Sequence, residues 1–212
     1  MSAVVVSVNV GRPRVVEWYG REVTTAIFKE PVAGRVLASD VNLAGDEQAD
    51  RRVHGGRDKA VYAYAVEDYR WWSERLGREL GPGTFGDNLT TAGLDLTTSA
   101  IGDRWRVGGT LLEVAQPREP CFKLGIRMGD AAFVDRFAEA RRPGAYLRIV
   151  EPGDLAAGDR ISVIPADGPT LRLVELVGDA TPDVLRRIAD DERVPDGWRR
   201  AARRALRGAG TS

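Results

Sequence analysis

The sequence is short of the residues that build disulfide frameworks and metal sites. Its 212 residues include one cysteine and one histidine. A single cysteine excludes an intrachain disulfide and fits a reducing compartment. A structural zinc site takes about four cysteine or histidine ligands, and an iron–sulfur cluster is usually held by several cysteines. The sequence therefore excludes both kinds of site in their usual form.

The sequence also lacks an excess of charge and a long apolar run. Its 31 basic and 31 acidic residues cancel, so the whole protein has no field that would attract a polyanion. The apolar N-terminal segment, residues 4–10, is short and has no basic region before it, which indicates a strand and not a signal peptide or membrane span. We expect a cytoplasmic protein that binds neither nucleic acid nor membrane.

Short apolar runs separated by Gly, Pro and Asp predict a mainly β fold with peripheral helices. Closing such strands into a β-barrel removes exposed sheet edges. The composition changes near residues 165–169, so we predict a barrel domain at 1–165 and a small helical segment at 170–207. The predicted strands are 3–10, 23–28, 32–38, 59–65, 104–107, 110–115, 145–150 and 160–164.

Helical spacing of apolar residues predicts two helices within the barrel domain and three after it. The first two are 66–77 and 130–141, the latter with Asp130 as its N-cap. Their aromatic residues fit core packing better than a ligand pocket. The last three are 170–177, 182–190 and 196–207, and the arginines of the final helix are interpreted as a solvated face.

The single cysteine, Cys121, lies in the run Gln-Pro-Arg-Glu-Pro-Cys-Phe-Lys-Leu. Nearby cations favour the thiolate, which is the nucleophilic and metal-binding form, and Arg118 and Lys123 flank the sulfur in sequence. The prolines at 117 and 120 predict an ordered loop or strand edge and not a helix. The alternative is that Cys121 is a buried small apolar residue.

Two other segments carry candidate site residues. The first contains His54, then Gly55-Gly56, then Arg57 and Lys59, and exposed amides beside these cations would suit an anion such as phosphate. An ordinary tight turn is the alternative. In the second, residues 85–90, a polar loop offers the amide of Asn88 to a ligand.

The familiar nucleotide and hydrolase motifs are missing. The sequence has no Walker loop, no dinucleotide fingerprint and no nucleophile elbow. A Cys121–His54 nucleophile–base pair stays open, because its members need only be adjacent in space. Two interpretations of Cys121 remain: a nucleophile, or the one protein ligand of a metal that an organic cofactor carries.

Several segments, in this order, resemble the MOSC domain, named for the C-terminal domain of molybdenum cofactor sulfurases. They are Gly-Asp-Glu-Gln-Ala-Asp at 45–50, Val-His-Gly-Gly at 53–56, Lys-Ala-Val-Tyr-Ala-Tyr at 59–64, Phe-Gly-Asp-Asn-Leu-Thr at 85–90, Ile-Gly-Asp at 101–103 and the cysteine segment at 116–124. Their order and spacing resemble the YiiM-like subgroup over residues 3–165. Residues 170–207 resemble the three-helix extension of that subgroup.

The resemblance implies a β-barrel that holds molybdenum cofactor, with the metal bound by the pterin dithiolene and, by motif position, Cys121. It also implies a reductase that converts N-hydroxylated substrates such as hydroxylaminopurine to amines, with electrons from a separate redox protein. Pyridoxal phosphate binding is a further association of the family. A homodimer is a candidate assembly.

The resemblance also suggests roles for the residues around Cys121. Lys29 and Lys59 are candidates for the pterin phosphate, and Arg118 and Lys123 would offset the negative charge of the cofactor. His54 and Asn88 are candidate cofactor contacts. Two other functions stay open: a carrier that bears a persulfide on Cys121 and delivers sulfur or cofactor, and a cofactor-free barrel that binds an anion.

Overall fold

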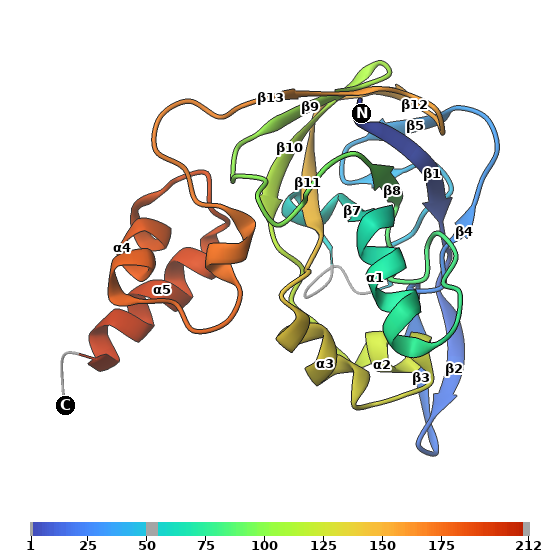
Figure 1. Ribbon diagram of the computed structural model, residues 1–212, viewed down its shortest axis with the longest axis horizontal. Helices are drawn as coiled ribbons and strands as arrows, with labels where there is room; N and C mark the ends of the chain where they lie inside the picture. The colour runs from blue at the N-terminus through green and yellow to red at the C-terminus, as the bar shows by residue number, and fades with distance from the viewer. Residues whose placement is uncertain (1, 50–54, 210–212) are drawn as a thin grey trace.

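The computed structural model describes residues 2–49 and 55–209, and its main feature is one curled sheet of eight strands (Figure 1). All neighbouring strands pair antiparallel except β7 and β8, which run parallel. The mainly β fold with peripheral helices is therefore confirmed. In spatial order the strands are β13 (Ile161–Ile164), β9 (Arg104–Val107), β10 (Thr110–Gln116), β11 (Ala145–Glu151), β7 (Val61–Ala65), β8 (Leu89–Ala92), β1 (Val4–Val10) and β4 (Glu30–Pro31).

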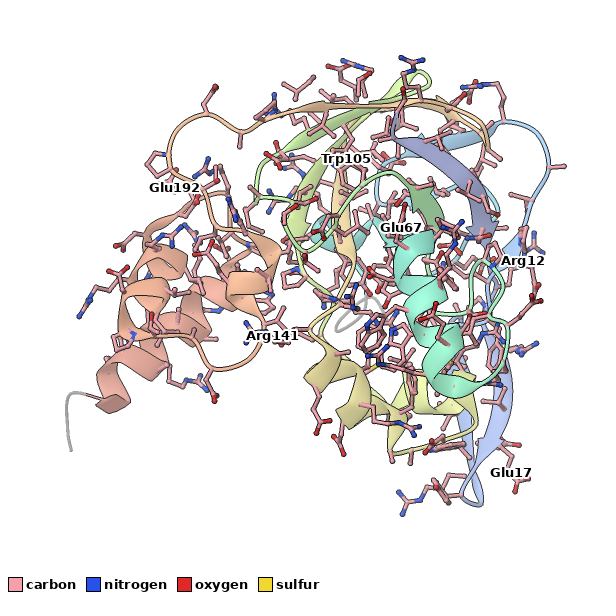
Figure 2. The ribbon with its side chains drawn as sticks, in the orientation of Figure 1. Arg12, Glu17, Glu67, Trp105, Arg141 and Glu192 are labelled. Atoms are coloured by element: carbon pink, nitrogen blue, oxygen red, sulfur yellow. The ribbon has the colours of Figure 1, made fainter. Side chains whose placement is uncertain are left out.

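Backbone hydrogen bonds join β1 to the β13 end of this sheet. The N–H of Val5 donates to the carbonyl of Asp159 at 2.9 Å, and the N–H of Ile161 donates to the carbonyl of Ala3 at 2.9 Å. Strand β1 therefore meets the segment leading into β13, and the sheet curves around an apolar core. Trp105 of β9 is fully buried in that core (Figure 2).

Two smaller sheets complete the β structure. One contains β5 (Val36–Ser39), β6 (Asn42–Leu43) and β12 (Gly153–Leu155), and the other is a hairpin of β2 (Arg14–Trp18) and β3 (Arg21–Thr25). The hairpin turn at Tyr19 and Gly20 has φ values of 49° and 71°, the left-handed pair that twists two strands correctly. The predicted strand 23–28 therefore extends past the end of β3 at Thr25, and no strand was predicted for its partner β2.

Helix α1 (Val66–Leu76) connects β7 to β8, a crossover that parallel strands require. It packs against α3 (Phe133–Ala140), with the rings of Trp72 and Phe133 4.8 Å apart. These aromatics belong to a buried cluster, which confirms that they are core. The predicted N-cap at Asp130 is wrong: α3 begins at Phe133, and Asp130 instead accepts a hydrogen bond from the N–H of Ala132 at 2.9 Å.

The cysteine segment differs from the prediction. Helix α2 (Phe122–Met128) starts directly after Cys121, where no helix was expected. The two prolines precede the helix and do not interrupt it, and Cys121 itself keeps an extended backbone with φ of −141° and ψ of 165°. The segment up to Cys121 is therefore extended, as predicted, and only its continuation was missed.

The C-terminal segment contains a 3-10 helix, η2 (Leu173–Leu176), followed by α4 (Pro182–Asp190) and α5 (Asp196–Ala209) beside the sheet (Figure 1). Helix α4 has the predicted bounds, with the Thr181 hydroxyl accepting a hydrogen bond from the N–H of Val184 at 3.4 Å. The predicted helix 170–177 is only the short η2. Ile188 and Ala202 are buried where the two α-helices pack.

Arginine side chains attach this segment to the barrel. Arg148 of β11 donates to Asp58 at 2.6 Å, to Glu113 at 3.0 Å and to the carbonyl of Arg193 at 2.9 Å. Arg193 in turn donates to the carbonyl of Asp167 at 2.9 Å. The connecting stretch and α4–α5 are therefore tied to β11 and to the segment around Asp58.

Candidate functional site

A cleft at one edge of the barrel brings together most of the residues singled out from the sequence. Six of the seven line it: Lys29, Lys59, Asn88, Arg118, Cys121 and Lys123. The seventh, His54, lies outside the described residues. The cleft therefore brings together residues that are far apart in the sequence, from Lys29 to Lys123.

Cys121 reaches this cleft from the position just before α2, and its side chain is half-buried. Arg118 lies close to it and is buried, with its guanidinium 5.0 Å from the centre of the Tyr62 ring and donating to the Phe85 carbonyl. Burial alone would lower the pKa of Arg118, but Tyr146, Tyr62 and Cys121 outweigh it and hold that pKa above its ordinary value. A permanent cation beside the sulfur favours the thiolate.

Two tyrosines form an aromatic wall next to Arg118. The rings of Tyr62 and Tyr146 are 4.9 Å apart. Burial raises the pKa of Tyr146, and it raises the pKa of Tyr62 further, although Arg118 opposes both shifts. Both phenols are therefore protonated near neutral pH, and Tyr62 donates to the Pro143 carbonyl at 2.8 Å.

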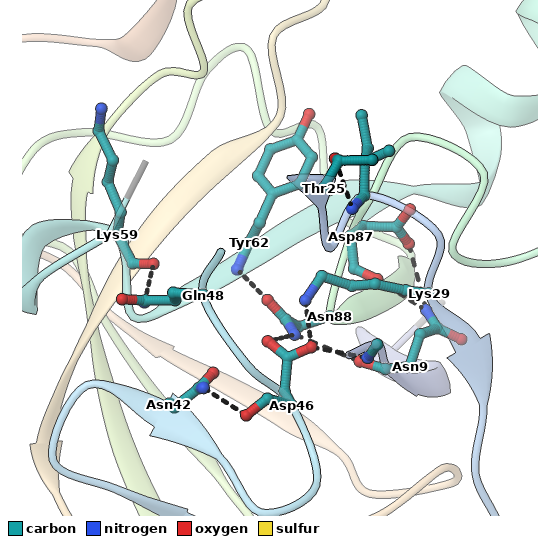
Figure 3. Close-up of polar contacts among 12 residues, drawn as sticks. Asn9, Thr25, Lys29, Asn42, Asp46, Gln48, Lys59, Tyr62, Asp87 and Asn88 are labelled. Carbon is teal, nitrogen blue, oxygen red and sulfur yellow. Dashed lines mark hydrogen bonds and ion pairs between the residues drawn. The ribbon is translucent and has the colours of Figure 1, made fainter. Parts of the chain in front are cut away.

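The floor of the cleft holds a buried ion pair between Lys29 and Asp46 (Figure 3). Lys29 is 8% exposed and Asp46 7%, so solvent screens this pair weakly. The same carboxylate oxygen, Oδ1, accepts from the N–H of Gly11 at 2.8 Å. Burial lowers the pKa of Lys29, and Asp46 counteracts that shift by attracting the ammonium. One cation of the cleft is thus already neutralised by a carboxylate.

Both polar atoms of the Asn88 side-chain amide form hydrogen bonds within the protein (Figure 3). Its Oδ1 accepts from the N–H of Tyr62 at 3.1 Å, and its Nδ2 donates to Oδ2 of Asp46 at 2.9 Å and to the Asn9 carbonyl at 3.2 Å. Asn88 therefore positions Asp46, and through it Lys29. Contact of Asn88 with a cofactor stays a prediction.

A buried carboxylate behind the cleft was not among the predicted site residues. Asp87 is 0% exposed; its Oδ1 accepts from the Tyr69 hydroxyl at 2.5 Å and its Oδ2 from Thr90 at 2.7 Å and Asn9 at 3.4 Å. Burial raises the pKa of Asp87, and the hydrogen bonds from Tyr69 and Thr90 counteract the shift. The carboxylate holds the turn before Asn88 in place. Its position next to Asn88 in sequence was the one signal that could have found it.

Lys59 and Lys123 approach the cleft from η1 (Arg57–Lys59) and from the start of α2. The Lys59 ammonium is 6.0 Å from the centre of the Tyr146 ring. Gln48 fixes the backbone nearby: its Nε2 donates to the Lys59 carbonyl at 3.4 Å, and its Oε1 accepts from the N–H of Gly56 at 3.1 Å. The predicted anion-binding region thus has a lysine at the cleft.

The donor set of the cleft matches one kind of metal group. Across residues 2–49 and 55–209, no three His, Cys, Asp or Glu side chains come together as a metal site. The cleft offers one thiol, four cations (Lys29, Lys59, Arg118 and Lys123) and an aromatic wall. Such a site fits an anionic cofactor that carries most of its metal's ligands with it. None of the described helices has the length and hydropathy of a membrane crossing.

Comparison with known proteins gives the family of this fold and cleft. The model of the MOSC domain matches residues 50–162, and the chain belongs to this family of molybdenum-cofactor-binding domains. Among its relatives, YflK of Bacillus subtilis is 38% identical over 76% of this chain and 72% of its own length. YiiM of Escherichia coli is 33% identical over 78% of this chain and 70% of its own length.

Solved structures agree with the fold. The crystal structure of YiiM from Geobacillus stearothermophilus covers 96% of this chain and 99% of its own, with 27% identity and a TM-score of 0.78. YiiM from Escherichia coli superimposes with a TM-score of 0.76 at 21% identity, over 99% of this chain and 94% of its own. The chain is thus similar to YiiM proteins beyond the matched domain, including its C-terminal segment.

Proposed function

We propose that this protein is a molybdenum-cofactor-dependent reductase that converts N-hydroxylated compounds such as hydroxylaminopurine to amines, with Cys121 as the protein ligand of the metal. The observation that carries the proposal is the meeting of Cys121, Arg118, Lys59 and Lys123 in one cleft of a MOSC fold. A protein named "Reductase" from Gibberella moniliformis supports it, with 34% identity over 71% of this chain, although the match spans 27% of that longer protein.

Different residues of the cleft would bind different parts of the cofactor. Cys121, as a thiolate beside Arg118, would bind the metal, while Lys59 and Lys123 would attract the negatively charged groups of the pterin. Lys29 is already paired with Asp46 at the floor of the cleft, where its ammonium could also donate to a phosphate of the cofactor. The rings of Tyr62 and Tyr146 would form the remaining side of the cofactor site.

The reaction adds two electrons and two protons to the N–O bond of the substrate, giving an amine and water. The cofactor, when bound, supplies the two-electron redox chemistry, and a separate redox protein supplies the electrons. The protein's own share is to bind the substrate against the cleft and to keep a cation beside the sulfur. The departing hydroxyl takes one proton to become water, and the amine nitrogen takes the other, both from solvent that enters the cleft mouth.

The test measures molybdenum and activity together. The protein is produced in a host that makes molybdenum cofactor, and metal content is determined for the wild type and for Cys121→Ala and Cys121→Ser. We expect near-stoichiometric molybdenum and hydroxylaminopurine reduction for the wild type, and loss of both in the variants. Molybdenum-free wild type from such a host would contradict the proposal.

A second candidate function is a sulfur carrier that bears a persulfide on Cys121. It is favoured by the half-buried thiol beside a buried arginine, an arrangement that also activates cysteine nucleophiles. Intact mass spectrometry distinguishes the two. A carrier should show an adduct of about 32 Da, one sulfur atom, on the wild type and none on Cys121→Ala, together with no hydroxylaminopurine reduction.

A further inference from the structure

A group of cationic and aromatic residues lies beside the cleft. Only one of them, Lys123, was assigned to the cofactor above. The group consists of Arg14, Phe28, Phe122, Lys123 and Arg127, which we call the cationic patch. Arg14 begins β2, Phe28 follows β3, and the other three belong to α2. Figure 1 shows α2 next to the β2–β3 hairpin. The patch therefore joins two elements at the side of the barrel where Cys121 lies.

Contacts to one ring hold the patch together. The guanidinium carbon of Arg14 is 3.5 Å from the centre of the Phe28 ring, and that of Arg127 is 5.2 Å from the same centre. Lys123 and Arg127 are four residues apart on α2, so they share one face of the helix. The backbone of Arg14 pairs with Thr25, a residue of the cleft wall. These contacts fix three positive charges next to the cleft.

The patch is partly exposed, and its three charged members are all basic. Phe122, the residue directly after Cys121, is 51% exposed. Among residues 2–49 and 55–209, no carboxylate forms an ion pair with Arg14, Lys123 or Arg127. Glu119 is the exposed acid of the same loop. The Phe28 ring thus lies against two cations that form no ion pair among the described residues.

These properties fit a protein partner better than a small ligand or a nucleic acid. Small molecules bind in concave sites, and of the patch only Lys123 lines the cleft. Arginine and aromatic residues are the groups enriched in protein interfaces. A nucleic-acid surface neutralises more phosphates, on the order of 6–10 for typical proteins, than three cations can.

We propose that the cationic patch docks an acidic electron carrier of the flavodoxin class. The proposal rests on the proposed reductase function and adds the place where its electrons enter. Two flavodoxin hydroquinones would each give one electron and become semiquinones. With two protons, the two electrons cleave the N–O bond to give the amine and water. Docking beside Phe122 would bring the flavin close to Cys121, and weak, charge-steered binding is typical of such redox encounters.

Binding tests the patch without any cofactor. Titration calorimetry measures flavodoxin binding to the wild type, to Arg14→Glu/Arg127→Glu and to the milder Arg14→Gln/Arg127→Gln. A matched control, Arg200→Glu/Arg204→Glu, makes the same charge change on α5. We expect binding that weakens with salt, a loss of about thirtyfold or more in the Glu pair, a smaller loss in the Gln pair, and under threefold in the control. Unchanged thermal unfolding of the Gln pair shows that the fold is intact.

Activity separates the docking from the reaction. Hydroxylaminopurine reduction is driven either by reduced flavodoxin or by photoreduced deazariboflavin, a small neutral donor. We expect the Glu pair to lose most of the flavodoxin-driven rate and to keep the deazariboflavin-driven rate. No turnover of the wild type with deazariboflavin would defeat the reductase function itself. The docking proposal is contradicted if flavodoxin does not bind, or if it binds the Glu pair as tightly as the wild type. It is also contradicted if the wild type binds a DNA duplex and the Glu pair does not.

Discussion

The amide of Asn88 fixes the carboxylate of Asp46 at 2.9 Å, and that carboxylate is the partner of Lys29 in the cleft. Because both partners of the ion pair are nearly inaccessible, the orientation of the lysine depends on an uncharged residue that itself lies 4% exposed. The cleft therefore has a rigid floor that exists before any ligand binds. Several measurable consequences follow from this and from the other buried polar contacts.

Asn88→Ala should lower the free energy of unfolding by about 2–4 kcal/mol, because it leaves the N–H of Tyr62 and one oxygen of Asp46 buried without a partner. Urea unfolding followed by circular dichroism measures it. The control is Asn42→Ala, whose half-buried amide donates to the Asp46 carbonyl at 2.5 Å and should cost about 1 kcal/mol. Equal effects of the two substitutions would contradict the central position of Asn88.

The raised pKa of Asp87 predicts a pH dependence of stability. A carboxyl whose pKa is higher in the folded than in the unfolded protein binds its proton more tightly when folded, so its contribution falls as pH rises from the ordinary value of 3.8 through the folded value. The stability of the wild type relative to Asp87→Asn should therefore be greatest near pH 4 and decline toward neutrality. Denaturant unfolding at a series of pH values measures it, and a difference that grows with pH would show that the pKa is lowered instead.

Arg148→Met should loosen the C-terminal segment, because it removes hydrogen bonds to Asp58, Glu113 and the Arg193 carbonyl at once. Arg148 is only 11% exposed, so we expect a loss of about 2–3 kcal/mol and faster proteolytic cleavage within residues 165–169. Arg106→Met, which breaks an exposed pair with Glu151, is the control and should leave cleavage unchanged. Cleavage at the wild-type rate in Arg148→Met would mean that other contacts hold the segment.

Lys59→Ala and Lys123→Ala should each weaken cofactor retention about tenfold, which corresponds to ~1.4 kcal/mol. Both lysines line the cleft, and each would lose an attraction to a negatively charged group. The molybdenum-to-protein ratio and the fluorescence of the released, oxidised pterin measure retention during dialysis. Arg200→Ala on α5 serves as a control for the loss of one positive charge. If all three variants retain cofactor alike, the two lysines are surface residues without a role in binding.

Local signals explain which parts of the fold could be predicted from the sequence. Helix α4 matches its prediction because Thr181 caps it and Pro182 starts it, and both act within one turn. Helix α2 was missed because Pro117 and Pro120 argue against a helix, while the chain turns helical only after Cys121. The strand β8 was missed because its polar residues are buried against β7 and β1, which only the tertiary fold decides.

The candidate site could be predicted in its members but not in their contacts. Cys121, Arg118 and Lys123 stand together in one segment, so their meeting is a local property of the chain. The pairing of Lys29 with Asp46 joins two loops that are 17 positions apart, and the burial of Asp87 depends on the packing around it. Side-chain direction at such places is set by packing, for which periodicity carries no signal.

The joining of residues 3–5 to residues 158–161 has a consequence for how the protein folds as it is synthesised. Strand β1 pairs with β8, more than eighty residues later. The first residues of β1 form their other backbone hydrogen bonds with the segment before β13, which is synthesised later still. Contacts between such distant positions make folding slow. The barrel can close only after the cysteine segment and β11 have left the ribosome. We therefore expect nascent chains shorter than about 160 residues to expose the apolar face of β1 and to depend on chaperones until closure.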